Sequence, residues 1–250
     1  MAELSAMDTV RAADKIIHDI GSTWMLDKET WEHGKRNGYA NPFAHYFAGR
    51  CGVLGDVDAD VVYAVLGWFA PNLVRPMWEE GIAVAGAREA TRRYALALAD
   101  WGREHVPEDP RLCELGERVV EAAEGSGLPL FSGWRAEPLP DDGPARLTHV
   151  LHLLRELRGG LHLVATTAMG LSPLEAVLAA NPPERARFLG WQGDLPDCGH
   201  LKKRREEAEE LTDRLCAAAY ERALSPAERA EFAERVGRTG EAVLGRRPSG

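Results

Sequence analysis

The chain has 250 residues and a formal net charge of −9 at pH 7, with 45% hydrophobic and 28% charged residues. This composition is typical of a globular protein that buries a substantial core, and it excludes low-complexity and fibrous classes. The acidic balance makes nucleic acid an unlikely partner, because phosphate binding depends on Lys and Arg that neutralise backbone charge.

The N-terminal stretch, MAELSAMDTVRAADK, is mixed and polar, which does not fit a signal peptide. Four cysteines, Cys51, Cys113, Cys198 and Cys216, lie far apart and form no Cys-x-x-Cys pair. This spacing argues against a thiolate zinc site and against a disulfide framework. No run approaches the roughly 20 apolar residues that a membrane span requires. We therefore expect a cytoplasmic protein with reduced thiols and no membrane contact.

Helix signals dominate the chain. Ser172, Asn181 and Ser225 each precede a proline and stand three residues before a glutamate, which is the pattern of a capped helix start. The only β-branched run, DVVYAV at 60–65, continues into sequence rich in Ala and Leu. We predict an all-α fold, with helices near 7–20, 57–69, 84–105, 111–124, 145–158, 161–169, 172–180, 201–222 and 226–244.

Proline and glycine interrupt this pattern at 37–43, 70–76 and 126–144. The last stretch is long enough to cross a surface or to cover a site. We expect it to connect an N-terminal helical lobe, residues 1–125, to a C-terminal lobe, residues 145–250, unless the two form one continuous domain. The expected architecture is a multi-helix orthogonal bundle with a pocket between the lobes.

The stretch LTHVLHLLRELRGGLHL, residues 147–163, is unusually rich in His, Arg and Glu. At 100° per residue His149, His152 and Glu156 share one face of a helix, nearly opposite the leucines. That face is either solvated or the wall of an internal cleft, where it could serve a metal or acid–base chemistry. The Gly159–Gly160 pair is expected to end the helix and to turn the following histidine, His162, back toward the same space.

A second candidate cluster is FAHYFAGR, residues 43–50. Tyr46 and Arg50 are one helical turn apart, which suits a pair that orients a carboxylate or phosphate. The alternative is an arginine that stacks on an aromatic ring or pairs with an acid. His18 follows two isoleucines, a setting more typical of a core or boundary residue. The basic patch LKKRREE at 201–207 is interpreted as a solvated helix, because acids follow immediately.

Several short segments share their order with a known family. They are YFAGRCGVLG (46–55), FAPNLV (69–74), GLPLFSGW (127–134), LLRELRGGLH (153–162) and LTDRL (211–215). In this order the chain resembles the SalK-like proteins, mainly helical bacterial proteins that are often labelled helix-turn-helix proteins and are named after a member from an antibiotic gene cluster. The resemblance spans almost the whole chain and implies a helical fold.

The resemblance also implies which residues belong to the family pattern and where this chain departs from it. The matching positions are His18, Tyr46, Arg50, His149, Arg155, Glu156, Arg158 and His162, whereas His45 and His152 do not match. Family members typically read Arg-Gly-Asp-Gly-His where this chain has RGGLH at 158–162, so an acidic group is missing. The winged-helix-like segment of relatives is also missing, because 188–215 has no room for it.

We therefore expect a protein that binds or processes a small molecule, in specialised metabolism as the resemblance implies. Whether it is an enzyme stays open. The alternatives are a ligand-responsive transcriptional regulator and a non-catalytic helical interaction protein, with a homodimer as one form. The cofactor is not specified by the sequence, and a first-row transition metal or haem would suit the histidines. The candidate catalytic residues are His149, Glu156 and His162, the substrate-binding residues Tyr46, Arg50, Arg155 and Arg158, and the metal ligands His18, His149 and His162.

Overall fold

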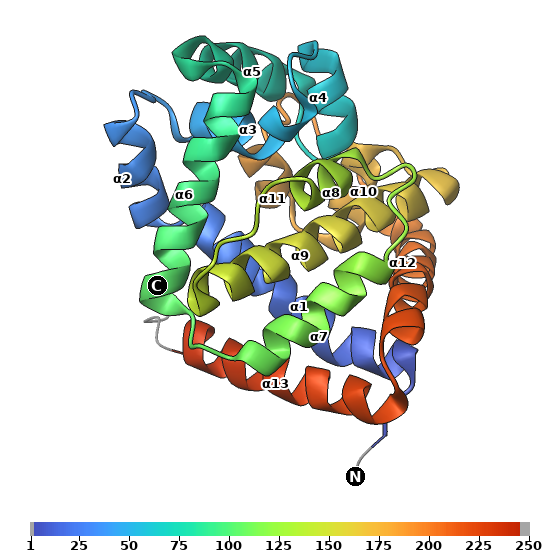
Figure 1. The fold of residues 1–250 in the computed structure, drawn as a ribbon. Helices are drawn as coiled ribbons and strands as arrows, with labels where there is room; N and C mark the ends of the chain where they lie inside the picture. The colour runs from blue at the N-terminus through green and yellow to red at the C-terminus, as the bar shows by residue number, and fades with distance from the viewer. Residues whose placement is uncertain (1–2, 246–250) are drawn as a thin grey trace.

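The computed structural model describes residues 3–245, and the regular structure in this range consists of helices with no strand (Figure 1). The prediction of an all-α, multi-helix fold is therefore confirmed. In chain order the elements are α1 (Ala6–Met25), α2 (Lys28–Arg36), α3 (Pro42–Cys51), η1 (Gly52–Leu54), α4 (Ala59–Leu66), α5 (Pro71–Ala85), α6 (Ala87–His105), α7 (Pro110–Ala122), α8 (Pro129–Arg135), α9 (Gly143–Ala168), α10 (Pro173–Ala180), α11 (Pro183–Phe188), η2 (Gly199–Leu201), α12 (Lys202–Ala223) and α13 (Pro226–Leu244).

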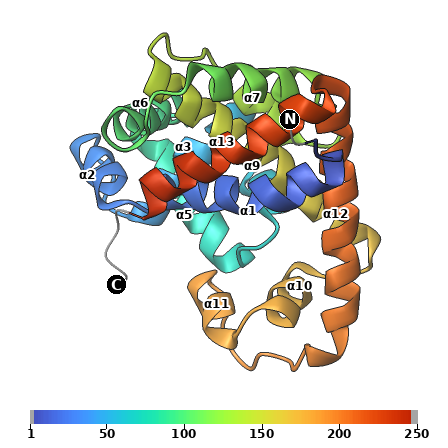
Figure 2. The same ribbon diagram turned by 90° about the horizontal axis from the view of Figure 1, so that it is seen from below.

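Helix α9 is the centre of the fold. It packs against α1, α6, α7, α8 and α12, and a hydrophobic core cluster with members from Ala6 to Val243 surrounds it (Figure 1). Helices α10 and α11 lie together at one end of the molecule, where α12 leads the chain back (Figure 2). Helix α9 belongs by sequence to the predicted C-terminal lobe, yet it packs on helices from the predicted N-terminal lobe. The division into two lobes stays a prediction.

Two of the three predicted helix starts are confirmed. Ser172 and Ser225 each form a capping box, in which the serine side chain accepts from the backbone N–H of the glutamate three residues on. The third prediction, at Asn181, is wrong. The amide of Asn181 instead donates to the carbonyl of Val177, 3.0 Å away, and so closes the end of α10. Helix α11 then begins after Pro182, without a side-chain cap.

Some of the residues interpreted as interruptions are helix starts. Asn41 caps α3, since its side chain accepts from the N–H of Phe43 at 2.8 Å, and Pro42 takes the first helical position. Pro71 takes the first helical position of α5 in the same way. A proline in the first turn fits a helix because its missing N–H would have no partner there. The connection at 126–144 likewise contains a helix, α8.

The predicted break at Gly159–Gly160 is also wrong, because α9 is continuous through both glycines. A side chain at Gly160 would come within 2.9 Å of Leu128 Cδ2, so this glycine permits close packing against the start of α8. A side chain at Gly159 would meet nothing within 4 Å. The loss of helix propensity, about 1 kcal/mol per glycine, does not outweigh the burial of the rest of α9.

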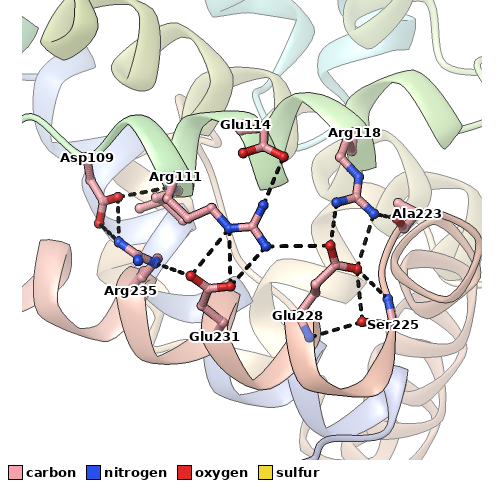
Figure 3. Close-up of polar contacts among 10 residues, drawn as sticks. Asp109, Arg111, Glu114, Arg118, Ala223, Ser225, Glu228, Glu231 and Arg235 are labelled. Atoms are coloured by element: carbon pink, nitrogen blue, oxygen red, sulfur yellow. Dashed lines mark hydrogen bonds and ion pairs between the residues drawn. The ribbon is translucent and has the colours of Figure 1, made fainter.

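An ion-pair network joins α7 to α13 (Figure 3). Its arginines lie 25–37% exposed, so the individual pairs contribute at most about 1 kcal/mol each. The network ties a helix from the first half of the chain to the last helix. Its members are Asp109, Arg111, Glu114, Arg118, Glu228, Glu231 and Arg235.

Within the described residues, no single helix has both the length and the apolar character needed to cross a membrane. Helices α9 and α10 meet that test only when they are taken together, across a bend of 102°.

Candidate functional site

The main cavity is a space of about 530 Å³ beside α9, bounded by α1, α3 and the α10–α12 end of the molecule. Its volume is in the range of small-molecule sites. One part of its lining is aromatic and consists of Phe43, Tyr46, Trp68, Phe69 and Phe188. A molecule inside would therefore contact several ring faces and edges.

The other part of the lining is charged, with an excess of positive groups. The basic residues are Lys15, Arg50, Arg155, Arg158, Arg185 and Arg205, whereas the acids are Asp14 and Glu209. This excess occurs in a chain whose net charge is −9. Since a low-dielectric concave wall concentrates the field of its charges, the cavity favours anions even though the chain as a whole is acidic.

Arg50 and Glu156 form a buried, two-pronged ion pair at the cavity wall. Arg50 Nε donates to Glu156 Oε1 at 2.9 Å and Nη2 donates to Oε2 at 2.8 Å. Arg50 Nη1 donates to the Tyr46 hydroxyl at 2.6 Å, so the spacing of Tyr46 and Arg50 does bring them together. Burial raises the pKa of Glu156, but attraction to the charged Arg50 and Arg155 outweighs burial and lowers it to about 2. Glu156 is therefore an ionised partner for arginines.

Arg155 shares the same carboxylate. Its Nη1 donates to Glu156 Oε1 at 3.0 Å, while its buried Nε has no hydrogen-bond partner among the described residues. The side chain crosses α1 at Gly21, where a Cβ would come within 2.3 Å of Arg155 Cδ. Burial lowers the pKa of Arg155, and the neighbouring Arg50 lowers it further. Two buried guanidinium groups therefore rely on one carboxylate, which leaves one positive charge without a counter-ion.

Arg158, one turn further along α9, is balanced by acids. It contacts Asp14 at 3.1 Å, Glu209 at 2.9 Å and Asp213 at 3.4 Å. Burial raises the pKa of Asp14 to about 7, although Arg158 acts in the opposite direction. The charge of Arg158 is thus largely satisfied within the protein, unlike that of Arg155.

His18 and His162 both line the main cavity. Burial lowers the pKa of each to about 4, so both rings are neutral near pH 7. His162 Nδ1 lies 2.8 Å from the Thr212 hydroxyl, which itself donates to the carbonyl of Ala208 at 2.7 Å. His162 must therefore donate from Nδ1, which leaves Nε2 as an acceptor. That Nε2 is buried and has no partner among the described residues.

His149 and His152 lie on a different side of α9, and neither lines the main cavity. They are 1% and 0% exposed and pack edge-on against Trp134, with ring centroids 5.8 and 4.5 Å away. Burial lowers the pKa of His149 to about 4 and that of His152 well below its ordinary value. The interpretation of this face as solvated is wrong, because α8 covers it.

The structure does not bring together the three histidines predicted as metal ligands. His18 and His162 line the main cavity, whereas His149 lies beside Trp134. In residues 3–245 no group of three or more His, Cys, Asp or Glu side chains is placed so that it could hold a metal ion. Of the residues predicted as catalytic, Glu156 pairs with arginines and only His162 lines the main cavity.

Helices α11 and α12 contribute cavity residues that the sequence did not indicate, and His18 was the only cavity residue predicted from α1. Arg205 is the clearest case, because the patch at 201–207 was interpreted as a solvated helix. That holds for Lys202, Lys203 and Arg204, which are exposed. Arg205 instead donates to Glu209 at 2.8 Å and lines the main cavity. Its position four residues before Glu209 was the only signal in the sequence.

A family model described as a helix-turn-helix family matches residues 10–192. This range contains α2–α11 and every residue of the main cavity except Arg205 and Glu209. Searches of curated proteins and of solved structures found no match.

Proposed function

The chain belongs to this helix-turn-helix family, and we propose that it binds a small organic anion in the main cavity. The observation that carries the proposal is Arg155, a buried guanidinium that shares its counter-ion with Arg50. A buried charge without a full partner is costly. An anion that enters the main cavity would restore the balance and accept charge-assisted hydrogen bonds.

The remaining lining narrows the chemistry of the ligand. Aromatic rings from α3, Trp68 and α11 favour a flat, largely apolar body next to the anionic group. The neutral His162 offers an acceptor at Nε2, which favours a ligand with a hydroxyl or N–H group. We therefore propose that the ligand is an aromatic carboxylate. Its carboxylate would contact Arg155, next to the Arg50–Tyr46 pair.

Within this proposal the predicted site residues take different roles. Arg155 contacts the anion, Arg158 holds the acidic side of the cavity in place, and His162 accepts a hydrogen bond or a proton from the ligand. His149 and His152 support α8. The finer resemblance to SalK-like proteins, based on the segments quoted above, agrees with a small-molecule function and is part of the proposal.

Calorimetric titration with benzoate tests the proposal, with Arg155→Gln as the decisive variant. Loss of a charge-assisted contact should weaken benzoate binding by about tenfold to a hundredfold. Arg204→Gln is the matched control, since Arg204 is exposed on α12 and does not line the main cavity. Equal affinity of the Arg155→Gln variant and the unchanged chain would contradict the proposal, as would an absence of binding to the unchanged chain.

The family match favours a second candidate, a ligand-responsive protein that binds nucleic acid, because helix-turn-helix modules in general place a helix in the DNA major groove. The net charge of −9 argues against it. Gel retardation of a duplex DNA pool at 50 and 200 mM salt separates the two, since phosphate contacts produce strongly salt-dependent binding. Absence of a retarded band at low salt would eliminate the second candidate.

A further inference from the structure

A second cavity, of about 170 Å³, lies on the other side of the Arg50–Glu156 pair. Helix α4 supplies Leu66 and its neighbours, the start of α8 supplies Leu128 and Leu130, and α9 supplies Leu163. We call this space the second cavity. It is much larger than the roughly 10–15 Å³ that one water molecule needs, so it can hold several non-hydrogen atoms of a ligand.

Most side chains that line the second cavity are apolar. Its only charged residues are Arg50 and Glu156, which pair with each other at 2.9 and 2.8 Å and so bring no net charge to this space. The remaining lining residues are aliphatic or aromatic side chains and glycines. A hydrocarbon group suits this space best, because the burial of apolar area against aliphatic and aromatic side chains is favourable.

The two cavities share part of their walls. Arg50, Trp68 and Gly159 line both of them. Gly159 stands in the middle of α9, where a glycine costs about 1 kcal/mol of helix propensity relative to alanine. A Cβ at this position would meet nothing within 4 Å, so the space beside Gly159 is open. Gly159 is therefore the shared lining residue beside which a larger side chain would have room.

We propose that the second cavity is the apolar subsite of the ligand that the main cavity binds. The anionic group lies at Arg155, and a hydrocarbon tail passes Gly159 into the space between α4, α8 and α9. The ligand class is then an amphipathic carboxylate, and Gly159 determines which tail lengths fit. The position of the anionic group at Arg155 rests on the proposed function, whereas the position of the hydrocarbon tail rests on the second cavity.

The test is calorimetric titration with benzoate, 4-butylbenzoate and 4-octylbenzoate. Each buried methylene should tighten binding about threefold to fourfold, so the butyl tail should gain more than tenfold over benzoate. Gly159→Leu should remove that gain. Ala64→Leu should do the same from the opposite wall, since Ala64 lines only the second cavity. Val61→Leu is the control, because Val61 is exposed on α4 and lines neither cavity.

The outcomes separate this inference from the proposed function. Suppose that benzoate binds through Arg155 but 4-butylbenzoate binds no more tightly. The tail subsite is then wrong and anion binding stands. The same conclusion follows if the gain in affinity from the butyl tail persists in both Gly159→Leu and Ala64→Leu. If Gly159→Leu also weakens benzoate, Ala64→Leu decides, because it leaves the main cavity unchanged. If none of the three benzoates binds the unchanged chain, both proposals fail.

Discussion

Ionisable residues lie toward both ends of α9, on different sides of the helix, and the two ends have different surroundings. At the N-terminal end, His149 and His152 are sealed against Trp134 and reach no cavity. At the C-terminal end, Arg155, Arg158 and His162 line the main cavity. Both ends carry ionisable groups, but His149 and His152 are buried whereas Arg155 and Arg158 are partly exposed. What differs is the cover, since the short helix α8 lies directly on one end while α10–α12 leave a cavity over the other.

Glu156 stands between the two ends. It lies 3.9 Å from His152 Nδ1 on the sealed side and pairs with Arg50 and Arg155 on the cavity side. At the sealed end, His149 and His152 are compatible with the fold only while their rings are neutral. At the cavity end, the charge of Arg155 is not fully balanced. An anionic ligand can balance the charge at the cavity end. The histidines of the sealed end stay neutral only while the pH remains well above their lowered pKa.

Acidification should produce the largest effect, through the buried neutral histidines, of which His149 and His152 form the sealed end. Because burial lowers the pKa of His149 to about 4, the folded chain resists a proton that the unfolded ring accepts at about pH 6.5. The stability that the neutral ring retains above pH 6.5 is lost as the pH falls toward 4. His152 and His162 act in the same direction. Asp14 acts in the opposite direction below pH 7, but it is one group against several.

Urea unfolding at pH 7 and pH 5 checks this expectation. Each such histidine should cost about 2 kcal/mol over that interval, from about 1.4 kcal/mol per pH unit below pH 6.5. His149→Leu should therefore lose less stability between the two pH values than the unchanged chain. His200→Gln, a change at an exposed position, is the control. A pH-independent unfolding midpoint would show that the sealed histidines are not the acid-sensitive element.

The next effect in size concerns the residue between the ends. Glu156→Gln should destabilise the fold by about 3–5 kcal/mol, because it leaves two buried guanidinium groups without a carboxylate. Glu231→Gln removes a carboxylate from the partly exposed network of Figure 3 and should cost at most about 1 kcal/mol. Urea unfolding at pH 7 measures both variants. Similar losses would mean that the Arg50–Glu156 pair is no more important than a surface pair.

This difference shows what the sequence could and could not predict. Helical spacing correctly placed His149, His152 and Glu156 on one face and the leucines opposite. It could not show that α8 would cover that face, because α8 lies within the Pro- and Gly-rich segment 126–144, which was interpreted as a connection. The capping boxes at Ser172 and Ser225 were predictable because the signal is local. Burial of a second face depends on packing between distant segments.

The same reasoning applies to the cavity residues. Tyr46 and Arg50 were found because one helical turn joins them. Arg155 and Glu156 were named as well, but the sequence could not show that one carboxylate serves two arginines, since Arg50 comes from 106 residues earlier in the chain. Arg185 gave no comparable local signal, and Arg205 gave only its spacing of four residues from Glu209. Their place at the main cavity depends on the position of α11 and α12.

The two ends should also differ in ligand binding. His162→Phe should weaken 3-hydroxybenzoate about threefold to tenfold and leave benzoate nearly unchanged, because only the hydroxyl can donate to His162 Nε2. His149→Leu should change neither affinity, since His149 does not line the main cavity. Calorimetric titration at pH 7 measures the affinity of each of the two variants for each of the two ligands. A loss of 3-hydroxybenzoate binding in His149→Leu would make the two ends functionally alike.

The smallest expected effect separates two neighbouring glycines at the cavity end. Gly159→Ala should stabilise the fold by about 0.5–1 kcal/mol, because alanine favours the helix and its Cβ meets nothing within 4 Å. Gly160→Ala gains the same propensity but forces Leu128 Cδ2 away from a contact of 2.9 Å, so its net gain should be smaller or reversed. Urea unfolding at pH 7 compares them. If both variants gain equal stability, α8 can shift to make room at Gly160. The packing of α8 over the sealed end is then looser than its contacts imply. If neither gains, the space beside Gly159 is not open, and a passage between the two cavities has no basis.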